Sequence, residues 1–170
     1  MQTPDASEYA PYYHRYVSLV PAGQCLALMH EQVGQMEALL SSVTDAQGMH
    51  AYAPGKWTLK EVIGHVADAE RVFGYRALHL ARGDANPLPS YEQDLWSPNG
   101  AFNALSVASV LGQWKTARLS NIAVAEGLPE EAHVRSGTVS GNPCTVRALV
   151  HMLPGHVAYH IAHMRQHYLA

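Results

Sequence analysis

Residues 57–83 read WTLKEVIGHVADAERVFGYRALHLARG and show the pattern of one long amphipathic helix. Thr58 is followed three residues later by Glu61, which is the spacing of a capping box at a helix N-terminus. Apolar side chains then recur every three or four residues, and Gly83 provides a C-terminal stop. These apolar positions are Leu59, Val62, Val66, Ala69 and Phe73. The stretch therefore predicts a helix with one buried face.

Three further segments show helical spacing of apolar residues. They span residues 21–43, a segment that begins at residue 103 or 106 and ends at residue 126, and residues 145–170. Four helices of roughly 20 to 25 residues, with no convincing run of strands between them, predict an all-α four-helix bundle. We expect a single domain over residues 1–170, in which residues 1–18 form an irregular lead-in.

The segments between these helices are rich in turn-forming residues. Residues 83–102 contain three prolines and two glycines, which predicts a long loop that either covers a site as a lid or crosses the bundle. Residues 127–143 predict a second break that could contain a short hairpin. Within the last helix, Pro154 and Gly155 predict a kink or a local break.

The composition is that of a globular protein. Apolar residues make up 48% and charged residues 15% of the chain, which is not the composition of a disordered protein. The formal net charge of −3 argues against a nucleic-acid partner, which requires a basic face. No apolar run approaches the roughly 18 residues of a membrane span, and the N-terminus lacks the pattern of a signal peptide. We therefore expect a cytoplasmic protein without a membrane partner.

The two cysteines, Cys25 and Cys144, match no CxxC pattern, and a disulfide is not expected in a reducing compartment. Cys25 lies in an apolar helical context and is interpreted as a packing residue. Cys144 follows a turn, so a reactive thiol is an alternative there, although only Arg147 brings a positive charge near it.

The stretch 155–168, GHVAYHIAHMRQHY, contains four of the eleven histidines of the chain. They form two pairs with a spacing of four residues, His156 with His160 and His163 with His167. Eleven histidines placed at random would give about 0.7 such pairs. Spacing alone is therefore weak support for a metal site.

Helical facing separates the inward histidines from the others. His160 falls within the apolar stripe of the last helix and His156 lies at its edge, whereas His163 and His167 lie nearer the polar side. His65 lies on the apolar face of the helix quoted above. A lone inward histidine is usually a satisfied core residue, but three that face one another in a bundle core could bind one ion. Three neutral histidines with an open position are typical of a catalytic rather than a structural metal site.

Two segments resemble the DinB superfamily. Residues 57–76, WTLKEVIGHVADAERVFGYR, are similar to its W-[ST]-x-x-E-x-x-x-H-[LV]-x-[DE] signature, and residues 151–165, HMLPGHVAYHIAHMR, are similar to its H-x-x-x-H-x-x-Q helix. The resemblance extends over nearly the whole chain. It implies an up-down-down-up four-helix bundle, often a homodimer, in which His65, His156 and His160 hold a divalent metal ion, typically zinc or nickel.

The resemblance also implies a kind of chemistry. Characterised members of the superfamily include transferases and isomerases that depend on low-molecular-weight thiols, so such a thiol is an expected small-molecule partner. This chain has His163 where members commonly carry glutamine. We interpret His163 as a polar group beside the ligands or as a residue that faces water, rather than as a fourth ligand.

Other polar and aromatic residues have simpler interpretations. Asp68, three residues after His65, could orient a ligand histidine or be a solvated acid beside Arg71. Trp57 is interpreted as a packing residue at the start of its helix rather than as a substrate platform. The histidines outside the constellation are interpreted as surface or capping residues, and they are His14, His30, His50, His79, His133 and His151.

The leading expectation is a metal-dependent enzyme, either a thiol-dependent transferase or a hydrolase. His65, His156 and His160 would hold the ion, and the open position would hold water or a substrate thiol. The ion would lower the pKa of that ligand and make it nucleophilic near neutral pH. The alternative is a non-catalytic module, in which the metal is structural or absent and the bundle acts by dimerisation or partner binding.

Overall fold

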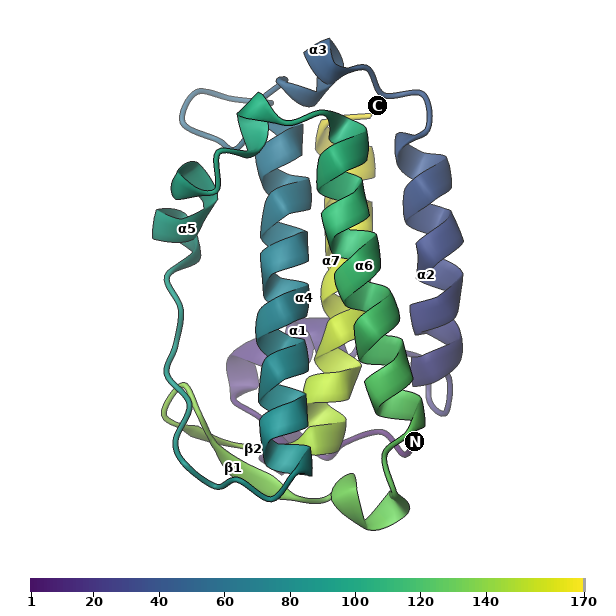
Figure 1. The fold of residues 1–170 in the computed structure, drawn as a ribbon, viewed down its shortest axis with the longest axis vertical. Helices are drawn as coiled ribbons and strands as arrows, with labels where there is room; N and C mark the ends of the chain where they lie inside the picture. Colours follow the sequence, from purple (N-terminus) through teal and green to yellow (C-terminus); the bar gives the residue numbers. More distant parts are fainter. Residues whose placement is uncertain (170) are drawn as a thin grey trace.

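The computed structural model describes residues 1–169 and confirms the four-helix bundle (Figure 1). Its long helices are α2 (Cys25–Leu40), α4 (Leu59–Ala81), α6 (Val107–Glu126) and α7 (Val146–His167). In Figure 1 they run up, down, down and up in chain order. Helix α4 packs against α6 and α7, and α2 packs against the same two helices. No helix among the described residues combines the length and apolar character that a membrane crossing requires.

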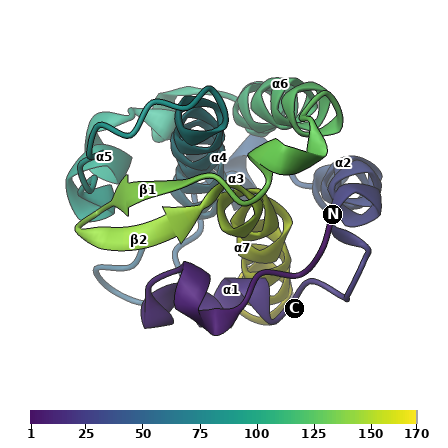
Figure 2. The ribbon, with the colours of Figure 1, turned by 90° about the horizontal axis from the view of Figure 1, so that it is seen from below.

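Short elements lie at the ends and along the sides of the bundle. The helical turns are η1 (Ala6–Glu8), η2 (Pro11–Tyr13), α1 (His14–Val17), α3 (Asp45–Gly48), α5 (Gln93–Asn99), η3 (Phe102–Ala104) and η4 (Glu130–Ala132). Strands β1 (Ser136–Val139) and β2 (Asn142–Thr145) pair antiparallel. This is the hairpin that the sequence allowed after residue 127, and Figure 2 shows it across the lower end of the bundle, near α1.

The long helices begin at the residues that their capping patterns indicate. Thr58 Oγ1 accepts a hydrogen bond from Glu61 N at 3.1 Å, and the Glu61 carboxylate accepts one from Thr58 N at 2.7 Å. The predicted capping box is therefore present. Ser106 and Thr145 cap α6 and α7, because each side chain accepts a hydrogen bond from the backbone N–H three residues later.

The first long helix is shorter than the predicted range 21–43. It begins at Cys25, because Gly23 adopts a φ of +74°, a left-handed conformation that a right-handed helix cannot include. It ends at Leu40, and the next two residues form a turn.

Of the two alternatives at Pro154 and Gly155, the local break is wrong, since α7 continues through both residues, and the kink stays a prediction. Proline has no N–H group, so the carbonyl of Val150 loses its usual helical donor. The Cys25 thiol lies 3.6 Å from that oxygen and donates to it. Gln32 Nε2 donates to the Pro154 carbonyl at 2.8 Å. Side chains of α2 therefore support α7 at the position where proline weakens it.

The N-terminal segment has more regular structure than the irregular lead-in expected for residues 1–18. It contains η1, η2 and α1, and α1 packs along α7. The Glu8 carboxylate binds the guanidinium of Arg147 and accepts a hydrogen bond from Thr145 Oγ1 at 2.7 Å. The hydrogen bond from Arg147 is the main reason that the pKa of Glu8 falls to about 2. These contacts fix the N-terminal segment to the start of α7.

Residues 83–102 cross the outside of α4 and include α5, a short helix that the sequence did not predict. Leu88 N donates to Thr138 O at 2.9 Å, and Ser140 N donates to Leu88 O at 2.9 Å. The crossing segment is thus tied to the hairpin by a parallel bridge between Leu88 and Val139. The segment crosses the bundle, as one alternative proposed, and α5 also packs on α4.

A buried ion pair lies between the two apolar halves of the core. Arg118 Nε and Nη2 donate to the Glu70 carboxylate at 2.9 and 2.8 Å, and both side chains are almost completely buried. Arg118 also donates to Gln32 Oε1 at 2.7 Å and to Leu153 O at 3.0 Å. Asn121 Nδ2 donates to the Glu70 carboxylate at 2.9 Å. All four long helices therefore contribute to this polar layer.

We predict that Gly155→Ala destabilises the protein by about 1–3 kcal/mol. A Cβ atom at this position would lie 2.2 Å from the Tyr16 carbonyl oxygen, so α1 would have to move away from α7. Gly34 lies on the exposed side of α2 and has nothing within 4 Å, so Gly34→Ala should stabilise by about 0.5–1 kcal/mol. Urea unfolding measures both changes. Equal stability of the two variants would contradict the close approach of α1.

Candidate metal centre

Three histidine side chains meet where α4 packs against α7. His65 comes from α4, whereas His156 and His160 come from one face of α7, and all three are buried. The Nε2 atom of His156 lies 3.2 Å from His65 Nε2 and 3.2 Å from His160 Nε2. One ring nitrogen from each residue lies within 4.8 Å of the others. The structure therefore brings together the three residues that helical facing selected.

The spacing of these nitrogen atoms fits a divalent metal ion. At a metal–nitrogen distance of about 2.0–2.1 Å and tetrahedral angles, two ligand nitrogens lie about 3.3 Å apart. The two separations of 3.2 Å agree with that value. Three histidines also leave a fourth tetrahedral position for another ligand.

Burial keeps the three imidazoles neutral. Removal from water lowers the pKa of His65 to about 4. It also lowers the pKa of His156 and His160 well below the ordinary value of 6.5, and the neighbouring histidines add to the effect. A neutral imidazole offers a lone pair, which a metal ligand must have. At neutral pH the three rings can therefore bind an ion without first losing a proton.

Aromatic side chains hold the histidine rings in position. The ring of Trp57 lies 5.1 Å from that of His65, and the ring of Tyr16 lies 5.0 Å from that of His156, measured between centroids. His160 Nδ1 is buried and has no hydrogen-bond partner among residues 1–169. Trp57 thus packs against one of the candidate ligands, and it also lines the pocket beside them, where a substrate platform would lie.

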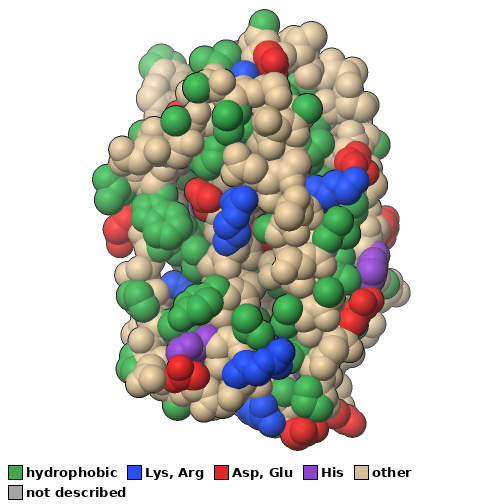
Figure 3. Space-filling view, in the orientation of Figure 1, with side chains coloured by type: hydrophobic (Ala, Val, Ile, Leu, Met, Phe, Trp, Pro, Cys, Tyr) green, Lys and Arg blue, Asp and Glu red, His purple; other side chains and the backbone are tan. Residues whose placement is uncertain are grey.

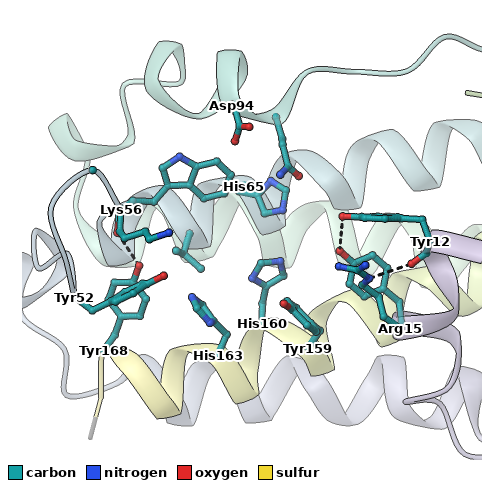
Figure 4. Close-up of a pocket in the computed structure, with 15 residues that line it drawn as sticks. Tyr12, Arg15, Tyr52, Lys56, His65, Asp94, Tyr159, His160, His163 and Tyr168 are labelled. Carbon is teal, nitrogen blue, oxygen red and sulfur yellow. Dashed lines mark hydrogen bonds between the residues drawn. The ribbon is translucent and has the colours of Figure 1, made fainter.

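A pocket of about 320 Å³ opens beside the histidines (Figure 4). His65 and His160 line it, and Figure 4 shows their rings facing each other from α4 and α7. His156 lines a neighbouring cavity instead. A small molecule in the pocket would therefore contact two of the three rings directly.

Much of the pocket wall comes from segments in which the sequence identified no individual site residue. The residues concerned are Tyr12, Arg15, Tyr16, Tyr52, Lys56, Gln93 and Asp94. The only signals for them were the many tyrosines before residue 18 and the length of the loop 83–102. Neither signal identifies an individual residue, since position in the wall depends on how these segments pack.

Charged side chains surround the two histidines in the pocket. Figure 4 shows Lys56 and Arg15 on opposite sides of the pair, and Asp94 above His65. The negative charge of Asp94 raises the pKa of His65 and so opposes part of the effect of burial. The pocket thus offers two cations and one carboxylate around the candidate ligands.

Asp68 and His163 do not join the three ligands. The Asp68 carboxylate lies 3.4 Å from Arg71 Nη1, and burial raises the pKa of Asp68. Of the two interpretations of Asp68, the structure supports the acid beside Arg71. His163 lines the pocket with its ring centroid 6.4 Å from that of His160. It is therefore a polar group beside the ligands, as one interpretation proposed.

The interpretation of His151 as a surface or capping residue is wrong. His151 is fully buried, and its Nδ1 donates to the Arg147 carbonyl at 2.8 Å. Burial lowers the pKa of His151, because the N-terminal segment packs along α7. The apolar periodicity of α7 does not predict the burial of His151, because the residues that cover it belong to a distant segment of the sequence.

Both cysteines are buried free thiols. Burial raises the pKa of Cys25 and of Cys144 to about 12. The packing role of Cys25 is confirmed by its position in the core. A reactive Cys144 is contradicted, since its thiol is protonated at neutral pH and lies out of reach of solvent.

Comparison with protein families matches residues 15–164 to the DinB superfamily. The chain belongs to the DinB superfamily. A relative from Oceanobacillus iheyensis, named as a candidate metal-dependent hydrolase (OB0413), is 24% identical over 160 residues, which cover 86% of this chain and 88% of the relative. YfiT from Bacillus subtilis, described as a candidate metal-dependent hydrolase with an unusual four-helix bundle topology, has a TM-score of 0.78 at 17% identity. That match covers 96% of this chain and 89% of YfiT.

We predict that this DinB-superfamily protein binds one divalent ion per chain and that a triple variant, His65→Ala with His156→Ala and His160→Ala, binds none. The triple variant loses the ion because these three side chains supply the nitrogen ligands. The control variant His167→Ala, on the same helix as His156 and His160, should keep the ion. Elemental analysis after dialysis measures the stoichiometry. Chelation should lower the melting temperature of the wild type but not of the triple variant, since an ion bound by the folded state stabilises it. Retention of the ion by the triple variant would exclude this site.

We also predict that neither cysteine of the folded protein reacts with a maleimide near pH 8. Their pKa values of about 12 keep both thiols protonated, and burial blocks the reagent. Both should react after unfolding in guanidinium chloride, which is the matched control. Mass spectrometry counts the adducts, and rapid labelling of native Cys144 would show that β2 opens to solvent.

Proposed function

We propose that this protein is a metal-dependent hydrolase whose divalent ion, zinc or nickel, is held by His65, His156 and His160. The observation that carries the proposal is the convergence of three neutral Nε2 atoms beside an open pocket, with 3.2 Å between neighbours. Three histidines with one open position are a ligand set of catalytic zinc sites. The names given to the relatives from O. iheyensis and B. subtilis support hydrolysis as the reaction class.

The protein contributes fixed lone pairs and an enclosed site. A divalent ion held by these residues would supply Lewis acidity at its open position. Packing of Trp57 on His65 and of Tyr16 on His156 keeps the rings oriented. The lowered pKa values mean that protons do not compete for the ring nitrogens near neutral pH.

Asp94 is the carboxylate placed to accept a proton in this pocket. It lies above His65 in Figure 4, and it lines both the main pocket and the neighbouring cavity that His156 reaches. A carboxylate at such a position acts as a general base toward an attacking water and then returns the proton to the leaving group. We therefore assign Asp94 the role of general base.

The two cations of the pocket favour an anionic substrate. Lys56 and Arg15 flank the histidines from opposite sides. Arg15 Nε donates to the Tyr12 carbonyl at 3.2 Å, and its guanidinium lies 4.2 Å from the centre of the Tyr12 ring, which holds it at the rim. Guanidinium and ammonium groups form their strongest hydrogen bonds with anions such as carboxylates. The proposed substrates are esters or amides that carry a carboxylate.

A substrate screen tests this proposal directly. Protein loaded with zinc or nickel is given carboxylate-bearing esters and amides, with uncharged analogues as controls, in the presence and absence of a chelator. Hydrolysis that prefers the carboxylate and stops on chelation is the expected result. A second arm supplies a low-molecular-weight thiol and an electrophilic acceptor, and turnover in that arm alone would replace hydrolysis by thiol transfer. Failure of both arms would favour the non-catalytic module.

We predict that Asp94→Asn lowers kcat by about 10²–10⁴-fold, the usual contribution of a general base. The metal content should stay unchanged, because Asp94 belongs to α5 and not to the three ligands. Glu31→Gln, on the exposed surface of α2, is the matched control and should keep full activity. Steady-state kinetics with parallel elemental analysis separate the two effects. An unchanged kcat would exclude Asp94 as the base.

A further inference from the structure

A second cavity lies between α4 and the crossing segment 88–96. It has a volume of about 400 Å³ and shares no lining residue with the pocket of the histidines. Figure 3 shows a hollow on this face of the molecule, bordered by hydrophobic and by Lys or Arg side chains, on the side where α4 and α5 lie in Figure 1. The volume is within the usual range of small-molecule sites, about 300–1,000 Å³.

The wall of this cavity is mostly apolar and aromatic. Leu88, Tyr91 and Trp96 line it from the crossing segment, and Val72 lines it from α4. The rings of Tyr91 and Trp96 lie 5.0 Å apart between centroids. Trp96 is 43% exposed although it borders a cavity. Aromatic walls of this kind bind planar rings by stacking and edge contacts.

The charged groups that line the cavity are all cations. Arg71 and Arg76 line it, and none of its lining residues is acidic. Arg71 is exposed and has a long contact of 3.4 Å with Asp68 outside the cavity lining. Arg76 is only 3% exposed, and none of the ion pairs found within residues 1–169 includes it. The Arg76 guanidinium lies 5.9 Å from the centre of the Tyr91 ring. The cavity therefore places a buried cation without a carboxylate partner beside an aromatic wall.

Arg76 also has unused hydrogen-bonding capacity. Its Nη2 donates to the Pro89 carbonyl at 2.6 Å and to Ser140 Oγ at 3.1 Å, which holds the crossing segment against α4. Its Nη1 is buried and has no hydrogen-bond partner among the described residues. A buried charged donor without an acceptor costs free energy that an anion would recover. One side of the guanidinium thus holds the crossing segment, whereas Nη1 on the other side has no acceptor.

We propose that this cavity binds a small aromatic carboxylate. The carboxylate would accept hydrogen bonds from Arg76, with Arg71 as a second cation, because guanidinium–carboxylate pairs are strong and directional. The aromatic body would pack against Tyr91 and Trp96. A neutral aromatic molecule would pack against the aromatic wall, but it would leave the Arg76 guanidinium without an anionic acceptor. The proposed site contains none of the three candidate metal ligands, so it stands independently of the proposed hydrolysis.

The site adjoins the segment that carries Asp94. Tyr91 lines both this cavity and the one that His156 reaches, and Trp96 belongs to α5 together with Asp94. A carboxylate could also bind a metal ion at the three histidines. The experiment must therefore separate binding at the second cavity from binding at the metal centre.

Calorimetric titration with 2-naphthoate tests the proposal. We expect saturable binding of one molecule per chain, and binding of the uncharged 2-naphthalenemethanol weaker by at least about tenfold, as the loss of a charged hydrogen bond implies. Arg76→Gln removes the charge, and Val72→Phe fills the cavity while leaving Arg76 in place. Each variant should weaken 2-naphthoate by at least about tenfold.

Two control variants define the site. Arg82→Gln removes an exposed arginine at the end of the same helix, and His65→Ala removes a candidate metal ligand. Both should bind 2-naphthoate within about twofold of the wild type. Circular dichroism checks that each variant is folded, and Val72→Phe decides the question if Arg76→Gln does not fold.

Three results would overturn the proposal. The first is no saturable binding of 2-naphthoate. The second is equal affinity for the acid and the alcohol, which would show that no cation recognises the carboxylate. The third is binding that His65→Ala abolishes while Val72→Phe preserves it, which would place the molecule at the metal centre.

Discussion

The buried pair of Arg118 and Glu70 constrains how the four long helices pack against one another. Both charges are removed from water, and loss of one partner from such a pair typically costs about 3–5 kcal/mol. Through Gln32 and Leu153 the pair also engages α2 and α7. Apolar packing alone tolerates shifts between helices, whereas these donors and acceptors match in one register. His156 follows Leu153 by three residues, so this polar layer lies one helical turn from the candidate metal centre on α7.

The sequence predicted the features that depend on short windows of residues. Thr58 and Thr145 mark helix starts because a capping side chain bonds to the backbone three residues later. His65, His156 and His160 could be selected because each lies in or beside an apolar stripe, and a stripe must face the core. The fold and the approach of the three rings follow from those local rules.

The features that the sequence did not predict depend on contacts between distant segments. Arg15 reaches the pocket because the N-terminal segment is fixed to α7 by Glu8 and Arg147. Asp94 reaches it on α5, a helix of seven residues with a proline inside, which is too short to show a periodic pattern. The continuity of α7 through Pro154 likewise relies on a thiol and an amide from α2. None of these partners lies near its target in the sequence.

The candidate ion ligands and the charged residues of the pocket wall belong to different parts of the chain. The three histidines lie on two long helices, whereas Arg15 lies on the N-terminal segment and Lys56 and Asp94 lie on connecting segments. Loops accept substitutions, insertions and deletions more readily than packed helices do. Descendants of one ancestral bundle can therefore acquire new substrate preferences by remodelling loops while the histidine geometry is inherited unchanged. Such modular divergence is compatible with a shared fold at sequence identities as low as 17%.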